Sequence, residues 1–252
     1  MQGIKKLLEK NPGLLRVSSL DQKKERRYKY EQTLKHDKVN ELAREYISWA
    51  SSIPGWKVDA FIIEKIFNFG KGAAREYAIN LSEIERLFNE VLPRYGRGGS
   101  LGFFISGLYK NLIMEGDVLK LNLMNYPATV SGLGYRHSYG RLEIIGDRAY
   151  YVGMEMEAGE IKVSGNVGNY LGKSMKGGRL IVDGNARNWI GEEMEGGFIM
   201  IRGGTGHIVG KKMTGGEIVI RGDAGYWIGD DATGGMIRVK AKDTFYPVCD
   251  LR

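Results

Sequence analysis

A glycine that returns every 19 residues constrains the fold of this 252-residue chain more than any other feature. Two more glycine columns follow the first five starts at intervals of 6 and 13 residues, and a weaker unit at 121–139 keeps Leu133-Gly134 in phase. Nineteen residues cannot enclose a core alone, so the units must stack and share one. The starts are Gly140, Gly159, Gly178, Gly197, Gly216 and Gly235, and the two columns are Gly146, Gly165, Gly184, Gly203 and Gly222, then Gly153, Gly172, Gly191, Gly210 and Gly229.

Apolar residues recur inside each unit at a spacing that predicts one short strand. The second and fourth residues after the start are apolar, as in Leu142 and Ile144 or Ile161 and Val163. This alternation is typical of a strand with one buried face. The glycines suit sharp corners, because glycine adopts positive φ without steric cost. The repeat therefore predicts a single-stranded parallel β-helix of 19-residue coils.

Charged residues alternate in sign from one unit to the next. Lys173, Glu192, Lys211 and Asp230 occupy one position of successive units. If the coils stack in register, each charge lies beside an opposite one on the neighbouring coil. An exposed pair contributes only about 0.2–1 kcal/mol, but a slipped register would place like charges together. The charges therefore support in-register stacking.

The repeat is most regular in the segment Gly165-x-x-Gly168-x-Tyr170-x-Gly172-x-x-Met175-x-Gly177-Gly178-x-x-Ile181-Val182. This segment resembles the glycine-rich repeat of the GXGXG family, which comprises the C-terminal domain of the large glutamate synthase chain and one of the chains of formylmethanofuran dehydrogenase. The resemblance covers about residues 121–240. It implies a right-handed β-helix that holds catalytic domains or subunits together, without active-site residues or a cofactor of its own. Ala149 and Arg187 depart from the glycine that this position holds in other units.

The chain divides into a helical region at 1–120, the β-helix at 121–240 and a capping tail at 241–252. One apolar helix face is predicted from Val39 to Ala50, a capping box at Ser82-x-x-Glu85 and a helix end at Pro93. Residues 101–114 are apolar almost all round, which predicts a buried helix. We expect the helices to cover the first coil and the tail to cover the last, because open ends invite aggregation.

An aromatic column follows the corner of each coil. Because the next residue is apolar in every unit and should point inward, the column should point outward. It is then either a surface for a protein partner or a stack packed under the N-terminal helices. The candidate docking residues are Tyr151, Tyr170, Trp189 and Trp227, with Ile208 between the last two.

Residues that could carry other chemistry are better explained structurally. Paired lysines at 211–212 separate the two acidic pairs, so a charge ladder is predicted rather than a catalytic pair. None of the histidines has a partner at helical spacing, and a single cysteine excludes a cysteine cluster, so no metal or cofactor is expected. The methionine column should fill the core. The residues concerned are Glu192, Glu193, Asp230 and Asp231, then His36, His137 and His207, then Cys249.

The sequence thus favours a non-catalytic structural or assembly subunit of a multi-subunit enzyme, with catalytic subunits or further copies of itself as partners. One alternative is a hydrolase or lyase that binds a polysaccharide in a groove along the coils. Another is a nucleic-acid-binding accessory protein that uses the basic segments Lys23–Lys38 and Arg94–Gly99, although interleaved acidic residues weaken this hypothesis. With no apolar run suited to a signal peptide or membrane span, a cytoplasmic protein without membrane insertion is expected.

Overall fold

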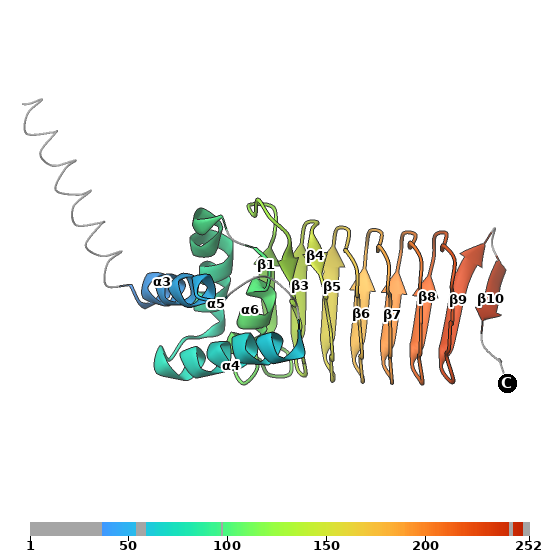
Figure 1. Ribbon diagram of the computed structural model, residues 1–252, viewed down its shortest axis with the longest axis horizontal. Coiled ribbons are helices and arrows are strands. Elements are labelled where there is room, and N and C mark those ends of the chain that lie inside the picture. The colour runs from blue at the N-terminus through green and yellow to red at the C-terminus, as the bar shows by residue number, and fades with distance from the viewer. Residues whose placement is uncertain (1–36, 54–58, 97, 242–243, 249–252) are drawn as a thin grey trace, which may run out of the picture.

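The structure is a computed structural model that describes residues 37–53, 59–96, 98–241 and 244–248. A helical cap, made of the helices that precede β1, lies at one end of a row of coils (Figure 1). The helices are α3 (Lys38–Ser51), α4 (Ala60–Glu76), α5 (Leu81–Arg86), the π-helix η1 (Leu87–Val91), the 3-10 helix η2 (Leu92–Tyr95) and α6 (Leu101–Tyr109). The strands are β1 (Val118–Asn122), β2 (Val130–Ser131), β3 (Arg141–Ile145), β4 (Ala149–Tyr150), β5 (Glu160–Ser164), β6 (Arg179–Val182), β7 (Phe198–Ile201), β8 (Glu217–Ile220), β9 (Met236–Ala241) and β10 (Thr244–Val248).

The strands form the predicted β-solenoid of 19-residue coils. One sheet has the order β1-β3-β5-β6-β7-β8-β9-β10, and the pairs from β1 to β9 are parallel. Successive coils pair in register, as Arg141 with Glu160 and Glu160 with Arg179. Isolated parallel bridges continue this stacking on the other walls, for example between Ile190 and Val209. The prediction of a parallel β-helix preceded by a helical region is confirmed.

The interior of the solenoid is apolar along its length. The two inward positions are buried in β1, β3, β5, β6, β7 and β8, and so are Met156, Met175, Met194 and Met213, as predicted. At the corner Gly178, with φ of 82°, a side chain would lie 2.6 Å from Met156 Cε. The glycine and methionine columns therefore depend on each other: the missing side chain leaves the space that the thioether fills.

The first coil is longer than the others. β1 pairs with β3 as Val118 with Arg141, a separation of 141 − 118 = 23 residues. At Leu133 the chain has returned to the 19-residue spacing between coils, and the Leu133 carbonyl accepts a hydrogen bond from Gly153 N at 3.0 Å. The solenoid thus begins at Val118, ahead of the boundary that the repeat placed at residue 121, and the extra residues lie between β1 and β2.

The helical cap confirms one sequence prediction and corrects three. α3 buries the expected face. The capping box is formed by Asn80 and Glu83, not by Ser82 and Glu85, because the Glu85 carboxylate instead accepts a hydrogen bond from the backbone of β1. Pro93 does not end the helical segment, because η2 includes this proline and continues to Tyr95. The buried helix α6 spans Leu101–Tyr109 rather than 101–114, since the chain turns after Tyr109.

The close crossing of α4 and α6 depends on two glycines. A methyl group at Gly107 would lie 2.1 Å from the Phe67 carbonyl oxygen, and one at Gly70 would lie 2.3 Å from the Phe104 carbonyl oxygen. The two backbones therefore approach more closely than side chains would permit. This crossing sets the position of α6, whose Ser106 hydroxyl donates to Gly132 O, just after β2 in the first coil, at 2.9 Å.

Side chains from the cap occupy the free edge of β1. Lys120 N donates to Glu85 Oε1 at 2.6 Å, and Asn122 N donates to Asn89 Oδ1 at 2.8 Å. The Asn89 amide also donates to Lys120 O at 3.0 Å, so it hydrogen-bonds as a neighbouring strand would. At the other end β10 pairs antiparallel with β9. Over the described residues the edges of β1 and β9 are thus both occupied, and β10 is the last strand of the sheet. Residues 242–243 and 249–252 of the predicted capping tail lie outside the described residues.

Candidate functional site

The aromatic stripe, defined as Tyr151, Tyr170, Trp189, Ile208 and Trp227, lies on the outside of the solenoid wall. The ring centroids of Tyr151 and Tyr170 are 4.6 Å apart at 11°, and those of Tyr170 and Trp189 are 5.6 Å apart at 20°. The residues that follow the first four members of the stripe, such as Val152, are buried, and Ile228 is partly buried. The chain thus alternates between outward and inward side chains at this corner, and the rings stack on the coil spacing of about 5 Å.

Every residue of the stripe has a left-handed backbone conformation. Their φ angles run from 52° at Tyr151 to 64° at Tyr170 and Ile208. This conformation costs residues other than glycine about 1–2 kcal/mol. Hydrogen bonds between coils hold it in place, for example from Tyr151 N to Asn169 O at 3.0 Å and from Tyr170 N to Asn188 O at 3.0 Å. The stripe therefore presents its rings on a fixed backbone.

Exposure of the stripe increases toward the C-terminal end. The first three rings are half-buried by one another, whereas Trp227 is 63% exposed. Its indole meets the His207 ring edge-on at 6.0 Å, and His207 stacks on Tyr226 at 5.4 Å. The stripe runs across the coils, whereas the helical cap lies at the β1 end (Figure 1). The described helices of the cap therefore do not cover the exposed Trp227.

The predicted carboxylates form ion pairs between coils. Lys173 Nζ lies 2.6 Å from Glu192, and Lys211 Nζ lies 2.8 Å from Asp230. The hydrogen bond to Asp230 raises the pKa of Lys211 above its usual value. Glu193 accepts a hydrogen bond from the Ser174 hydroxyl at 3.1 Å. Glu192, Glu193 and Asp230 thus have partners on neighbouring coils, and general acid or base catalysis by these groups has no support here.

A shallow groove of about 590 Å³ follows another wall of the solenoid, beside Asp147, Arg148, Tyr150 and Arg187. Its floor is a polar ladder in which each side chain accepts a hydrogen bond from the next coil. Asn166 N donates to Asp147 Oδ1 at 2.7 Å, and Asn185 continues the ladder. Among the described residues that line the groove, Asp147 is the one carboxylate, and it is already hydrogen-bonded. The groove therefore lacks the carboxylate pair that a glycosidase would need.

The histidines lie in unrelated environments. His137 is buried beneath the helical cap, where burial lowers its pKa to about 4 and its Nε2 lies 3.3 Å from Gly140 O. His207 is exposed, and its Nδ1 accepts a hydrogen bond from Tyr226 N at 3.0 Å. His36 and Cys249 lie outside the described residues. Over the described ranges, no three His, Cys, Asp or Glu side chains gather where they could hold a metal ion, and no helix has the length and apolar character to span a bilayer.

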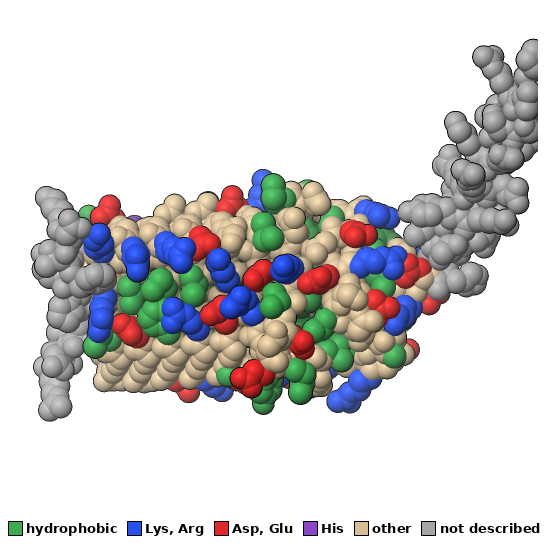
Figure 2. Space-filling model, turned by 180° about the vertical axis from the view of Figure 1, so that it is seen from behind, with side chains coloured by type: hydrophobic (Ala, Val, Ile, Leu, Met, Phe, Trp, Pro, Cys, Tyr) green, Lys and Arg blue, Asp and Glu red, His purple; other side chains and the backbone are tan. Residues whose placement is uncertain are grey.

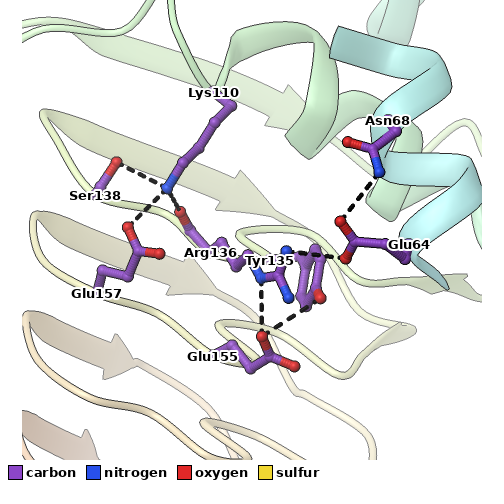
Figure 3. Close-up of polar contacts among 8 residues, drawn as sticks. All are labelled: Glu64, Asn68, Lys110, Tyr135, Arg136, Ser138, Glu155 and Glu157. Carbon is purple, nitrogen blue, oxygen red and sulfur yellow. Dashed lines mark hydrogen bonds and ion pairs between the residues drawn. The ribbon is translucent and has the colours of Figure 1, made fainter. Parts of the chain in front are cut away.

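A polar cluster fastens the helical cap to the first coils (Figure 3). The Arg136 guanidinium donates to Glu64 of α4 at 2.9 Å and to Glu155 at 2.8 Å. On the other side of this cluster, Lys110 donates to Glu157 at 2.8 Å and to Arg136 O at 2.5 Å. Sequence reasoning missed this cluster because its members are distant in the chain. These contacts indicate that the cluster holds the helical cap against the first coils.

Comparisons with known proteins do not assign the chain to a family. No model of a known protein family matches the chain, and a search of curated proteins found no relative. The resemblance to the GXGXG family therefore stays a prediction from the repeat itself.

Proposed function

We propose that this protein is a non-catalytic structural or assembly module that binds other proteins through the wall of its solenoid. The observation that carries the proposal is the aromatic stripe, a row of outward rings on a rigid backbone that ends in the exposed Trp227. Around it, the interior is filled with apolar side chains and many wall charges are paired between coils. Among the surfaces described so far, the stripe is the one best suited to burial against a partner.

The physical chemistry of the stripe supports protein recognition. Aromatic side chains supply a large contact area and lose little conformational entropy, so they dominate the free energy of many interfaces. Here the neighbouring rings and the fixed backbone reduce that entropic cost further. The GXGXG resemblance suggests the kind of partner, namely the catalytic subunits of an amidotransferase or of a formyl-group oxidoreductase.

The test is affinity purification of the full chain from its native host, with identification of the proteins that co-elute. We expect catalytic subunits to co-elute with the wild type and Trp227→Ala to weaken their retention at least tenfold. The matched control is Tyr226→Ala, which removes a ring that is 75% exposed next to the stripe but outside it. A chain that elutes alone, or equal losses in both variants, would contradict the proposal.

A further inference from the structure

The outward face of the large sheet changes character along the solenoid. Its central column carries charges on β3 and β5, where it holds Glu143 and Lys162. On β6, β7 and β8 the same column holds Ile181, Met200 and Val219. Phe198 replaces a charged residue in the column beside it. We define Ile181, Phe198, Met200 and Val219 as the sheet patch, and it interrupts the charge ladder with apolar side chains on the outward face. Ile181, Phe198 and Met200 are half-buried, and Val219 is 8% exposed.

Basic side chains border the sheet patch. The Arg179 guanidinium lies 4.6 Å from the centroid of the Phe198 ring. Arg202 lies 3.0 Å from Asp183, and Arg238 lies 3.4 Å from Glu217. Arg179 also lies 4.0 Å from Glu160, and Lys162 pairs in register with Ile181. With the exposed Arg221, the border has five basic residues against three carboxylates, a net charge of 5 − 3 = +2. Figure 2 shows hydrophobic side chains gathered toward the C-terminal end of one face, with Lys and Arg on both sides.

We infer that the sheet patch binds an amphipathic helix of a protein partner, whose apolar stripe is flanked by acidic residues. The spacing supports a helix that lies along the solenoid axis. Neighbouring coils are about 4.8 Å apart, and apolar residues at i, i+3 or i+4, and i+7 of a helix recur about every 5 Å. Three such residues would match Ile181, Met200 and Val219, and acidic flanks would face the arginines on either side.

Charge disfavours two other occupants of the sheet patch. Residues 1–36 of this chain carry 10 Lys and Arg against 4 Asp and Glu, so they would meet the basic border with like charge. A second copy that used the same face would place arginines opposite arginines. An acidic partner gains the complementary interaction that both of these lack. The inference rests on the proposed assembly function, but it concerns a different wall from the aromatic stripe.

The experiment places a photoreactive benzoylphenylalanine at Met200 of the full chain and irradiates it in a soluble extract of the native host. We expect cross-links to a segment with net negative charge and apolar residues at helical spacing. Arg202→Glu with Arg221→Glu should reduce the cross-link yield at least tenfold. The matched control is Arg187→Glu, which reverses an exposed arginine on the groove wall and should leave the yield unchanged.

The captured segment is then made as a synthetic peptide and titrated against the protein. A version with its acidic residues changed to Gln and Asn should bind at least tenfold more weakly at low salt. Cross-links to a second copy, to nucleic acid, to a neutral or basic segment, or to nothing would each overturn the inference. If catalytic subunits co-elute but cross-link only through the aromatic stripe, the proposed function stands and this inference fails.

Discussion

At the scale of single residues, the aromatic stripe shows a conflict between backbone and side chain. Its positions have a left-handed conformation, which suits glycine, yet four of the five hold Tyr or Trp. Stacking between coils offsets part of the conformational cost at Tyr151, Tyr170 and Trp189, whose rings pack on one another. Ile208 has the same conformation, with φ of 64°, but is β-branched and breaks the row of rings.

Ile208→Tyr should therefore raise the free energy of unfolding. The ring would lie between Trp189 and Trp227, and each new stacking contact contributes about 0.5–1.5 kcal/mol. Ile208→Leu is the control, because it removes the β-branch without adding a ring. Urea denaturation of the three proteins tests this expectation, and a Tyr variant no more stable than the Leu variant would contradict it.

His137 makes the stability of the fold depend on pH. Because burial lowers its pKa from 6.5 to about 4, the folded chain takes up this proton less readily than the unfolded chain. The contribution of neutral His137 to the free energy of unfolding is therefore fully present above pH 6.5. It is lost as the pH falls from 6.5 to 4. The expected loss is about 3 kcal/mol.

His137→Gln, which is neutral at every pH, should remove this dependence. The measurement is the free energy of unfolding at pH 7 and at pH 4, for the wild type and the variant. Carboxylates titrate in both proteins, so the difference between the two pH dependences isolates His137. Parallel pH dependences would show that the histidine is protonated equally in the folded and unfolded chains.

At the scale of elements, the crossing of α4 and α6 positions the cap on the solenoid. Gly107→Ala should destabilise the protein by about 1–3 kcal/mol, because the added methyl group would overlap the Phe67 carbonyl. Gly72→Ala on α4 is the matched control, since a methyl group there meets nothing within 4 Å. The control should stabilise the helix by about 0.5–1 kcal/mol. Thermal unfolding followed by circular dichroism distinguishes the two, and similar shifts in both variants would contradict the close crossing.

At the scale of the whole molecule, the cap protects the open end of the solenoid. Glu85 and Asn89 satisfy backbone groups of β1 that would otherwise form a free strand edge. Glu85→Ala combined with Asn89→Ala should expose this edge and make the chain associate as its concentration rises. Light scattering over a concentration series measures the effect, with Glu90→Ala, an exposed change on the same helical segment, as the control. A double variant that remains as dispersed as the control would show that these side chains do not protect the edge.

The solenoid, its coil length and its register were all predictable from the amino-acid sequence. These follow from local periodicity: strand residues, corner glycines and alternating charges recur every 19 residues, so each coil specifies the next. The outward direction of the stripe at Tyr170 followed from the same periodicity. The apolar residues of the sheet patch also occupy columns of the repeat. Their interpretation as a docking surface required the structure, which shows which arginines lie beside Met200.

The way in which the cap and the coils meet could not be predicted from the sequence and required the three-dimensional structure. The helical region has no repeat, so nothing in the sequence indicates that Arg136 reaches Glu64 or that Asn89 hydrogen-bonds like a strand. The capping box was assigned to the wrong pair for the same reason: Glu85 has its partner on β1, which local spacing cannot reveal. Contacts between neighbouring coils repeat at a fixed separation and can be read from the chain, whereas contacts between unlike parts depend on how those parts pack together.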